Sequence, residues 1–185
     1  MLKDSRTSYG LISIIFHWVC APLILFVFGL GVYMRGLDYY SPWYHRGPEL
    51  HIALGVLIFI LMSLRLLWRA RSLSLDPIPT IPKSTLLAAT LVKYVIYFAV
   101  FAICITGYLI TTAEGSGARF FGLFSVPATL ELSADNIDRA GFLHKYIAWS
   151  LIAIVILHAA AALFHHFIKR DKTLVRMLKP GNKSL

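Results

Sequence analysis

Residues 141–168 read GFLHKYIAWSLIAIVILHAAAALFHHFI, and this apolar run decides the fold. A helix needs about 20 predominantly apolar residues to cross the hydrocarbon core of a bilayer. We predict that the run is helical, because an open strand would leave its backbone N–H and C=O groups without partners in lipid. The run contains four histidines, of which His144 and His158 lie away from its C-terminal end, where His165 and His166 are found.

Three further apolar runs precede it, at residues 11–34, 50–68 and 86–112. We therefore predict an all-α integral membrane protein, a four-helix bundle that forms a single domain over residues 1–185. The connections are expected to be loops, including a loop that contains Pro42 and Pro48 and a longer one at 113–140. Residues 169–185 are expected to form a basic C-terminal tail.

The composition supports a membrane protein. Of the 185 residues, 58% are hydrophobic and 15% are charged, with a mean hydropathy of +0.70. A soluble domain carries about 25% charged residues. These values exclude a disordered or collagen-like chain and disfavour a water-soluble globule.

The basic residues are divided unequally between the two ends of the spans, and this predicts that both termini are cytoplasmic. The formal charge of +9 needs no nucleic acid to explain it, because a basic tail can contact anionic lipid headgroups. The cytoplasmic group is Lys3, Arg6, Arg65, Arg69, Arg71, Lys83, Lys93, Lys169, Arg170, Lys172, Arg176, Lys179 and Lys183; the outer group is Arg35, Arg46, Arg119, Arg139 and Lys145.

Four of the seven histidines, His17, His51, His144 and His158, lie in the apolar runs before the HHFI end of the last run. Ionisable residues are costly there and usually mark function. His144 and His158 are 14 residues apart, which is about four helical turns with roughly 40° of angular drift and 21 Å of rise. They therefore share a helix face at two depths. Judged by its place in the second span, His51 matches His144 near the outer side. His17 matches His158 near the cytoplasmic side.

Two histidine pairs at two depths indicate two haem sites, because a haem iron takes two axial imidazoles and a helical bundle can supply one from each side. Gly31 leaves the first span without a side chain near the outer pair, which would give space to a porphyrin ring. Arg65 lies 14 residues after His51 and could contact haem propionates. The alternatives are histidines that serve as interhelical hydrogen-bond partners, and a zinc or copper site.

Several motifs make the chain similar to the prokaryotic cytochrome b561 family, di-haem four-helix proteins of the bacterial inner membrane that include the superoxide oxidase. The resemblance implies two haem b groups, held by His51 with His144 and by His17 with His158. The motifs are Ser13-Ile14-Ile15-Phe16-His17-Trp18, Pro48-Glu49-Leu50-His51, Gly107-Tyr108-Leu109, Leu143-His144, Leu157-His158-Ala159-Ala160-Ala161-Ala162 with His165-His166, and Asp171-Lys172-Thr173-Leu174-Val175-Arg176-Met177.

The same resemblance implies electron exchange between membrane ubiquinone and a substance at the outer face. In the superoxide oxidase, superoxide gives the electron and ubiquinone receives it. A periplasmic lipocalin-like isoprenoid-binding protein is a candidate partner of related proteins. Lys83 matches a family position near an anion or quinone site, whereas Lys93 stands where relatives commonly carry histidine; Lys93 could snorkel to the interface or pair with a propionate.

His165 follows His158 by seven residues and is a candidate proton or hydrogen-bond partner for a quinone headgroup. It could equally be an interfacial histidine or a propionate contact. Three functions stay open at this point. The first is an electron-transfer cytochrome that exchanges electrons with ubiquinone and acts as a superoxide:ubiquinone oxidoreductase. The second is a haem-containing anchor or relay subunit without a substrate of its own, and the third is a transporter or structural protein with incidental histidines.

Overall fold

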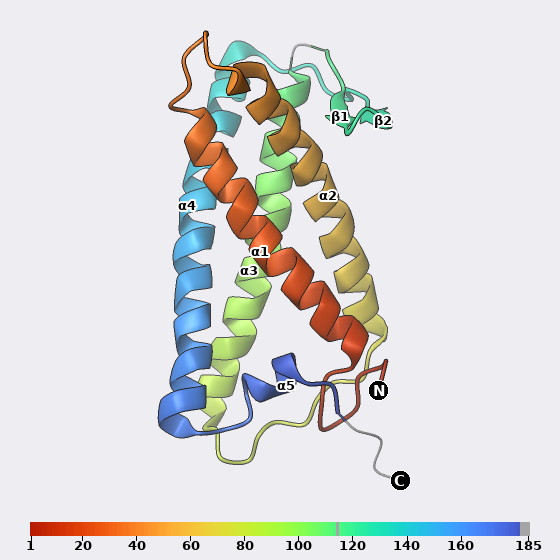
Figure 1. Cartoon of the computed structure of the whole chain (residues 1–185), viewed down its shortest axis with the longest axis vertical. Helices are drawn as coiled ribbons and strands as arrows, with labels where there is room; N and C mark the ends of the chain where they lie inside the picture. Colours follow the sequence, from red (N-terminus) through yellow and green to blue (C-terminus); the bar gives the residue numbers. More distant parts are fainter. Residues whose placement is uncertain (114, 182–185) are drawn as a thin grey trace. The chain divides into compact units, whose positions relative to one another are not determined.

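The computed structural model describes residues 1–113 and 115–181, most of which are helical (Figure 1). Each of the four long helices is apolar enough to cross a membrane, with a mean hydropathy of 2.1 to 2.4 over its most apolar 18 residues. The predicted all-α membrane fold with four spans is confirmed. These helices are α1 (Leu11–Met34), α2 (Trp43–Arg71), α3 (Lys83–Thr112) and α4 (Ala134–Phe164).

Most apolar side chains of the long helices face outward. Only 6% to 22% of each apolar window is buried within the protein, whereas a surface helix of a soluble protein turns its apolar stripe toward the core. Phe26 and Phe98, for example, are 57% and 75% exposed. A surface of this kind is stable against lipid tails, so the packing agrees with a location in the membrane.

Two helices extend beyond their apolar runs into segments predicted as loops. α2 begins at Trp43 rather than at residue 50, so Pro48 lies inside the helix. α4 begins at Ala134 rather than at residue 141, and Asp135 in its first turn interacts favourably with the helix dipole. Hydropathy marks only the turns that lie in hydrocarbon, so it does not identify the polar turns at the interface.

The connection after α3 contains a β-hairpin that was not predicted. Strands β1 (Ala118–Phe120) and β2 (Phe124–Val126) pair antiparallel. Phe121 and Gly122 in the turn between them have φ values of 47° and 74°. Positive φ at both central residues is typical of the tight turns that join hairpin strands, but it is unusual for a residue as bulky as phenylalanine.

The segment predicted as a basic tail is folded where the structure describes it. After α4 the chain forms a π-helical turn, η1 (His165–Lys169), reverses at Arg170 with φ 54°, and continues into α5 (Val175–Leu178). The Trp18 Nε1–H donates a hydrogen bond of 2.7 Å to the Met177 carbonyl, which holds α5 against α1. Residues 182–185 of the predicted tail lie outside the described residues.

The contacts within the chain divide it into two compact units, and each long helix contributes residues to both. The pair His17 and His158 belongs to unit 1, whereas the pair His51 and His144 belongs to unit 2. Unit 1 comprises Met1–Ala21, Leu61–Tyr97 and Ala153–Leu185; unit 2 comprises Pro22–Ile60 and Phe98–Ile152.

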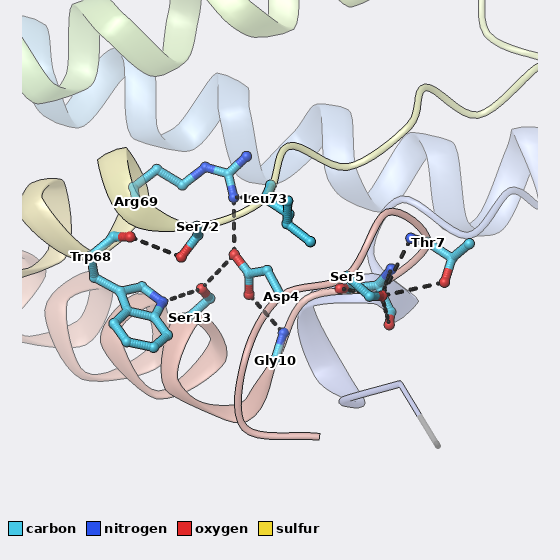
Figure 2. Close-up of polar contacts among 10 residues, drawn as sticks. Asp4, Ser5, Thr7, Gly10, Ser13, Trp68, Arg69, Ser72 and Leu73 are labelled. Atoms are coloured by element: carbon cyan, nitrogen blue, oxygen red, sulfur yellow. Dashed lines mark hydrogen bonds and ion pairs between the residues drawn. The ribbon is translucent and has the colours of Figure 1, made fainter. Parts of the chain in front are cut away.

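In unit 1 the segment before α1 is fixed by the buried carboxylate of Asp4 (Figure 2). Its Oδ1 accepts a hydrogen bond from the Gly10 N–H at 2.8 Å, and its Oδ2 accepts from the Ser13 hydroxyl and the Arg69 guanidinium, each at 2.9 Å. The Trp68 indole donates to Ser13 Oγ. Since the Asp4 side chain is 0% exposed, Arg69 compensates a charge that would otherwise be unpaired in the protein interior.

Candidate functional site

In unit 2, His51 of α2 and His144 of α4 face each other. Their ring centroids are 6.1 Å apart and their planes are inclined by 66°. An imidazole nitrogen binds a first-row metal at about 2 Å, so two nitrogens on opposite sides of one iron lie about 4 Å apart. The separation of the two rings is compatible with a shared metal atom. The two imidazoles come from different helices, as expected from the positions of His51 and His144 along their spans.

The imidazole of His144 is oriented by the backbone of α3. Its Nδ1 lies 3.1 Å from the Ile103 carbonyl oxygen and 3.2 Å from the Thr106 hydroxyl. The carbonyl can only accept, so Nδ1 carries the proton and donates it there. This tautomer leaves a lone pair on Nε2, which is the arrangement typical of a metal-binding histidine.

The imidazole of His51 has a buried polar atom that lacks a partner. Its Nδ1 makes no hydrogen bond of normal geometry with any described residue, although the Val27 backbone is close enough to interact electrostatically with the ring. Buried polar atoms are nearly always satisfied, so each exception requires an explanation. One explanation is a group bound at Nε2 of His51. Such a group would fix the ring and let its Nδ1–H turn toward the Val27 carbonyl.

Two glycines make room for these imidazoles. A Cβ built on Gly31 of α1 would lie 2.9 Å from Cε1 of His51, and one built on Gly107 of α3 would lie 3.0 Å from Cε1 of His144. The space at Gly31 is therefore used by the His51 ring rather than directly by a porphyrin. The role of Gly107 was not predicted, although a glycine inside an apolar span is a sign of close approach between helices.

In unit 1, His17 and His158 are close enough to interact electrostatically, and Arg65 acts on both. Nη2 of Arg65 lies 3.1 Å from Nδ1 of His17. A guanidinium can only donate, so Nδ1 of His17 accepts in this arrangement. Binding of a metal at Nε2 of His17 would move the ring proton to Nδ1 and leave Arg65 free to pair with a carboxylate, such as a haem propionate.

The other predicted site residues have different environments. His165 is paired with Asp171, a partner that sequence reasoning missed because Asp171 lies beyond the span. Lys83 is the first residue of α3 and is exposed. Lys93 is also exposed, with Nζ 5.7 Å from the ring centroid of Tyr94.

A second feature of unit 2 is a pocket of about 330 Å³ between the hairpin and the first turns of α2. Its lining includes two arginines and one glutamate, so the pocket carries a small net positive charge. Leu50, which directly precedes His51, also lines it. The strained Phe121 forms one wall. The lining residues are Arg46, Glu49, Leu50, Ala53, Arg119, Phe121 and Gly122.

Among the described residues, no cluster of three or more His, Cys, Asp or Glu side chains could hold a metal ion. Structural zinc sites usually have four protein ligands and catalytic ones three, whereas a haem iron needs only two axial ligands from the protein. The paired histidines therefore suit haem better than a zinc or copper ion coordinated by protein alone.

Comparisons with known proteins point in the same direction. A family model described as prokaryotic cytochrome b561 matches residues 8–180. The chain is 45% identical to cytochrome b561 homolog 2 of Escherichia coli (strain K12), over 95% of this chain and 93% of that protein. It is 30% identical to the probable superoxide oxidase CybB of Yersinia pestis, over 92% and 96% respectively. Cytochrome b561 homolog 1 of Escherichia coli (strain K12) is 26% identical, over 90% and 94%.

Proposed function

The chain belongs to the prokaryotic cytochrome b561 family, membrane haem proteins that transfer electrons, and on this premise we propose that it binds two haem b groups and passes electrons from superoxide to ubiquinone. It is a multi-pass protein of the bacterial inner membrane. The observation that carries the proposal is the facing pair of His51 and His144, which two different helices supply.

When bound between two imidazoles, haem iron supplies reversible one-electron chemistry. The residues of this chain fix where it would be held: His51 and His144 in unit 2, and His17 and His158 in unit 1. The Ile103 carbonyl keeps the proton of His144 on Nδ1, so that Nε2 stays available. Arg65 is the cation that would neutralise a propionate next to His17.

The pocket beside α2 supports superoxide as the electron donor. Arg46 and Arg119 give it a positive excess, and in the predicted orientation it faces the periplasm. A positive potential raises the local concentration of an anion and its rate of association. Similarity to a probable superoxide oxidase supports the same donor. In the overall reaction two superoxide anions each lose one electron and leave as O₂, while ubiquinone takes up both electrons and two protons.

For ubiquinone we propose a site in unit 1, close to His165. This histidine follows His158 along α4, and its partner Asp171 makes it a defined hydrogen-bonding group. Lys83 is proposed as an additional cation of this site by the resemblance of its position to the family pattern.

Stopped-flow absorbance of the purified protein tests the proposal. Superoxide alone should produce the spectrum of reduced haem, and addition of a short-chain ubiquinone should restore the oxidised spectrum. The ratio of haem to protein in the same preparation should be close to two. A preparation whose spectrum responds to neither reagent would contradict the proposal, and a colourless protein would contradict haem binding itself.

A second candidate function is that of a haem-containing relay subunit for a periplasmic protein. The hairpin favours it, because Leu123 at the turn is 78% exposed and Phe121 is 50% exposed. The candidate partner is a lipocalin-like isoprenoid-binding protein. If the relay function is correct, that protein should bind the wild type and not a variant with a short Gly-Ser linker in place of residues 118–126, and superoxide should not reduce the haem.

A further inference from the structure

The end of α4 brings His165 and Asp171 into contact through both backbone and side chain. In the π-helical turn η1 and the reversal that follows it, the N–H groups of Arg170 and Asp171 both donate to the His165 carbonyl. Short π-helical segments are rare and often occur at functional sites. Here the turn returns the chain onto the histidine that precedes it.

Both oxygens of the Asp171 carboxylate have partners. Oδ2 accepts a hydrogen bond from Nδ1 of His165, and Oδ1 accepts one from the Thr173 N–H at 2.8 Å. The side chains of His165 and Asp171 are only 16% and 8% exposed. The imidazole is therefore held in one orientation, and its Nε2 makes no hydrogen bond with any residue that the structure describes.

A histidine whose Nδ1–H is held by a carboxylate is well suited to proton transfer at Nε2. The carboxylate fixes the tautomer and stabilises the imidazolium form. Burial raises the pKa of Asp171, but hydrogen bonds from Thr173 and His165 outweigh this effect, so the pKa lies below its usual value. Asp171 is thus ionised at neutral pH and can act on His165 as a negative charge.

The position of this pair along α4 matters for quinone chemistry. His165 lies seven residues after His158, which is about two helical turns and roughly 10 Å further along nearly the same face. Reduction of ubiquinone requires protons at the place where it takes up electrons. A proton donor two turns beyond a proposed iron ligand is close enough to serve a quinone bound between them.

We propose that Asp171 is a positioning residue that prepares His165 to protonate reduced ubiquinone. This inference rests on the proposed function. In the step, the reacting form of His165 is the imidazolium, which carries a proton on each ring nitrogen. Its N–H bond at Nε2 breaks and an O–H bond forms at a quinone oxygen that has gained its electron from the superoxide side, which leaves the neutral ring with its remaining proton on Nδ1, next to Asp171. His165 then regains a proton from water, and Asp171 stays ionised throughout.

The test compares two electron acceptors. Wild type and Asp171→Asn are reduced in advance with a trace of dithionite, and haem reoxidation is followed after mixing with decylubiquinone or with ferricyanide, which takes no proton. The asparagine can still accept the hydrogen bond from Thr173, so the turn is expected to fold. Asp76→Asn is the matched control, because Asp76 is an exposed acidic residue of the same unit.

General acid catalysis by a positioned side chain contributes about 10² to 10⁴ in rate, and loss of its orienting carboxylate should remove part of that. We expect Asp171→Asn to slow reoxidation by the quinone about tenfold and to leave reoxidation by ferricyanide unchanged. The double variant His165→Gln/Asp171→Asn should be no slower than His165→Gln alone, because the two residues act as a unit. Asp76→Asn should match the wild type with both acceptors.

Two results would overturn this inference while leaving the proposed function in place: an Asp171→Asn variant as fast as the wild type toward the quinone, or one slowed equally toward both acceptors, which would indicate a purely structural role. A wild-type protein that the quinone fails to reoxidise, although ferricyanide does so, would contradict the proposed function and this inference together.

Discussion

Gly31 of α1 approaches the imidazole of His51 so closely that a Cβ at this glycine would lie 2.9 Å from Cε1. Gly29, two residues earlier on the same helix, has no atom within 4 Å of the corresponding position. The two glycines therefore have different roles in one helix. Gly31 sets how near α1 comes to the His51 ring, whereas Gly29 faces open space.

The first prediction follows from this difference. Gly31→Ala should displace the His51 ring or push α1 away, at a cost of about 1–3 kcal/mol typical of an overpacked site. We expect the variant to lose part or all of one haem, measured as haem per protein, or to shift the reduction potential of that haem. Gly29→Ala is the control and should keep both haems, with a helix stabilised by roughly 0.5–1 kcal/mol. Equal haem content and potentials in the two variants would contradict the role of Gly31.

The second prediction concerns which histidines share an iron. His51→Ala and His144→Ala should each remove the same haem, because their rings face each other in unit 2. His17→Ala and His158→Ala should each remove the other haem. Low-temperature absorbance spectra and haem content of the four variants distinguish the two groups. Our pairing would be wrong if His144→Ala and His158→Ala abolished one shared haem.

The spans could be predicted from the sequence because hydropathy measures the transfer of side chains into lipid, which is the property that decides a membrane helix. The grouping of His51 with His144 was predicted as well, since their depth follows from counting residues along each helix. The identity of the bound group cannot be read from such counting alone. Haem is inferred from the number of ligands, because its iron needs only two imidazoles from the protein, and from the family resemblance.

Other features depend on contacts that the sequence does not reveal. The hairpin could not be predicted from the residues of its turn, because Phe121 adopts a positive φ there, a conformation that is rare for phenylalanine. The partner of His165 lies after a chain reversal at Arg170, which also has positive φ. The fixed N-terminal segment depends on Asp4 reaching Arg69, 65 residues away in the chain.

The third prediction concerns the pocket beside α2. Arg119→Gln removes one of its two cations, so the rate of reduction by superoxide should fall several-fold and depend less on ionic strength. Arg139→Gln, which removes a cation that does not line the pocket, should have little effect. Stopped-flow measurements at low and high salt provide both quantities. An Arg119→Gln variant with wild-type rate and wild-type salt dependence would exclude the pocket as the route of the anion.

The fourth prediction concerns the buried carboxylate in unit 1 (Figure 2). Asp4→Ala removes the acceptor for Gly10, Ser13 and Arg69 at once. Breaking a buried ion pair by removing one partner typically costs about 3–5 kcal/mol, but Arg69 is partly exposed, so we expect a loss of about 2 kcal/mol. The melting temperature in detergent should fall while the haem spectrum stays unchanged. Asp76→Ala, at an exposed position of the same unit, should leave the melting temperature within error of the wild type.

The fifth prediction uses the lowered pKa of Asp171. Because the folded-state pKa lies below the unfolded value of about 3.9, ionised Asp171 stabilises the folded protein at pH values above the unfolded pKa. That contribution should disappear as the pH falls through the folded-state pKa. The melting temperature of Asp171→Asn should therefore be lower than that of the wild type at pH 7, and the difference should shrink as the pH is lowered toward 3. A difference that stays constant over this range would show that the carboxylate stabilises the turn through its shape and not through its charge.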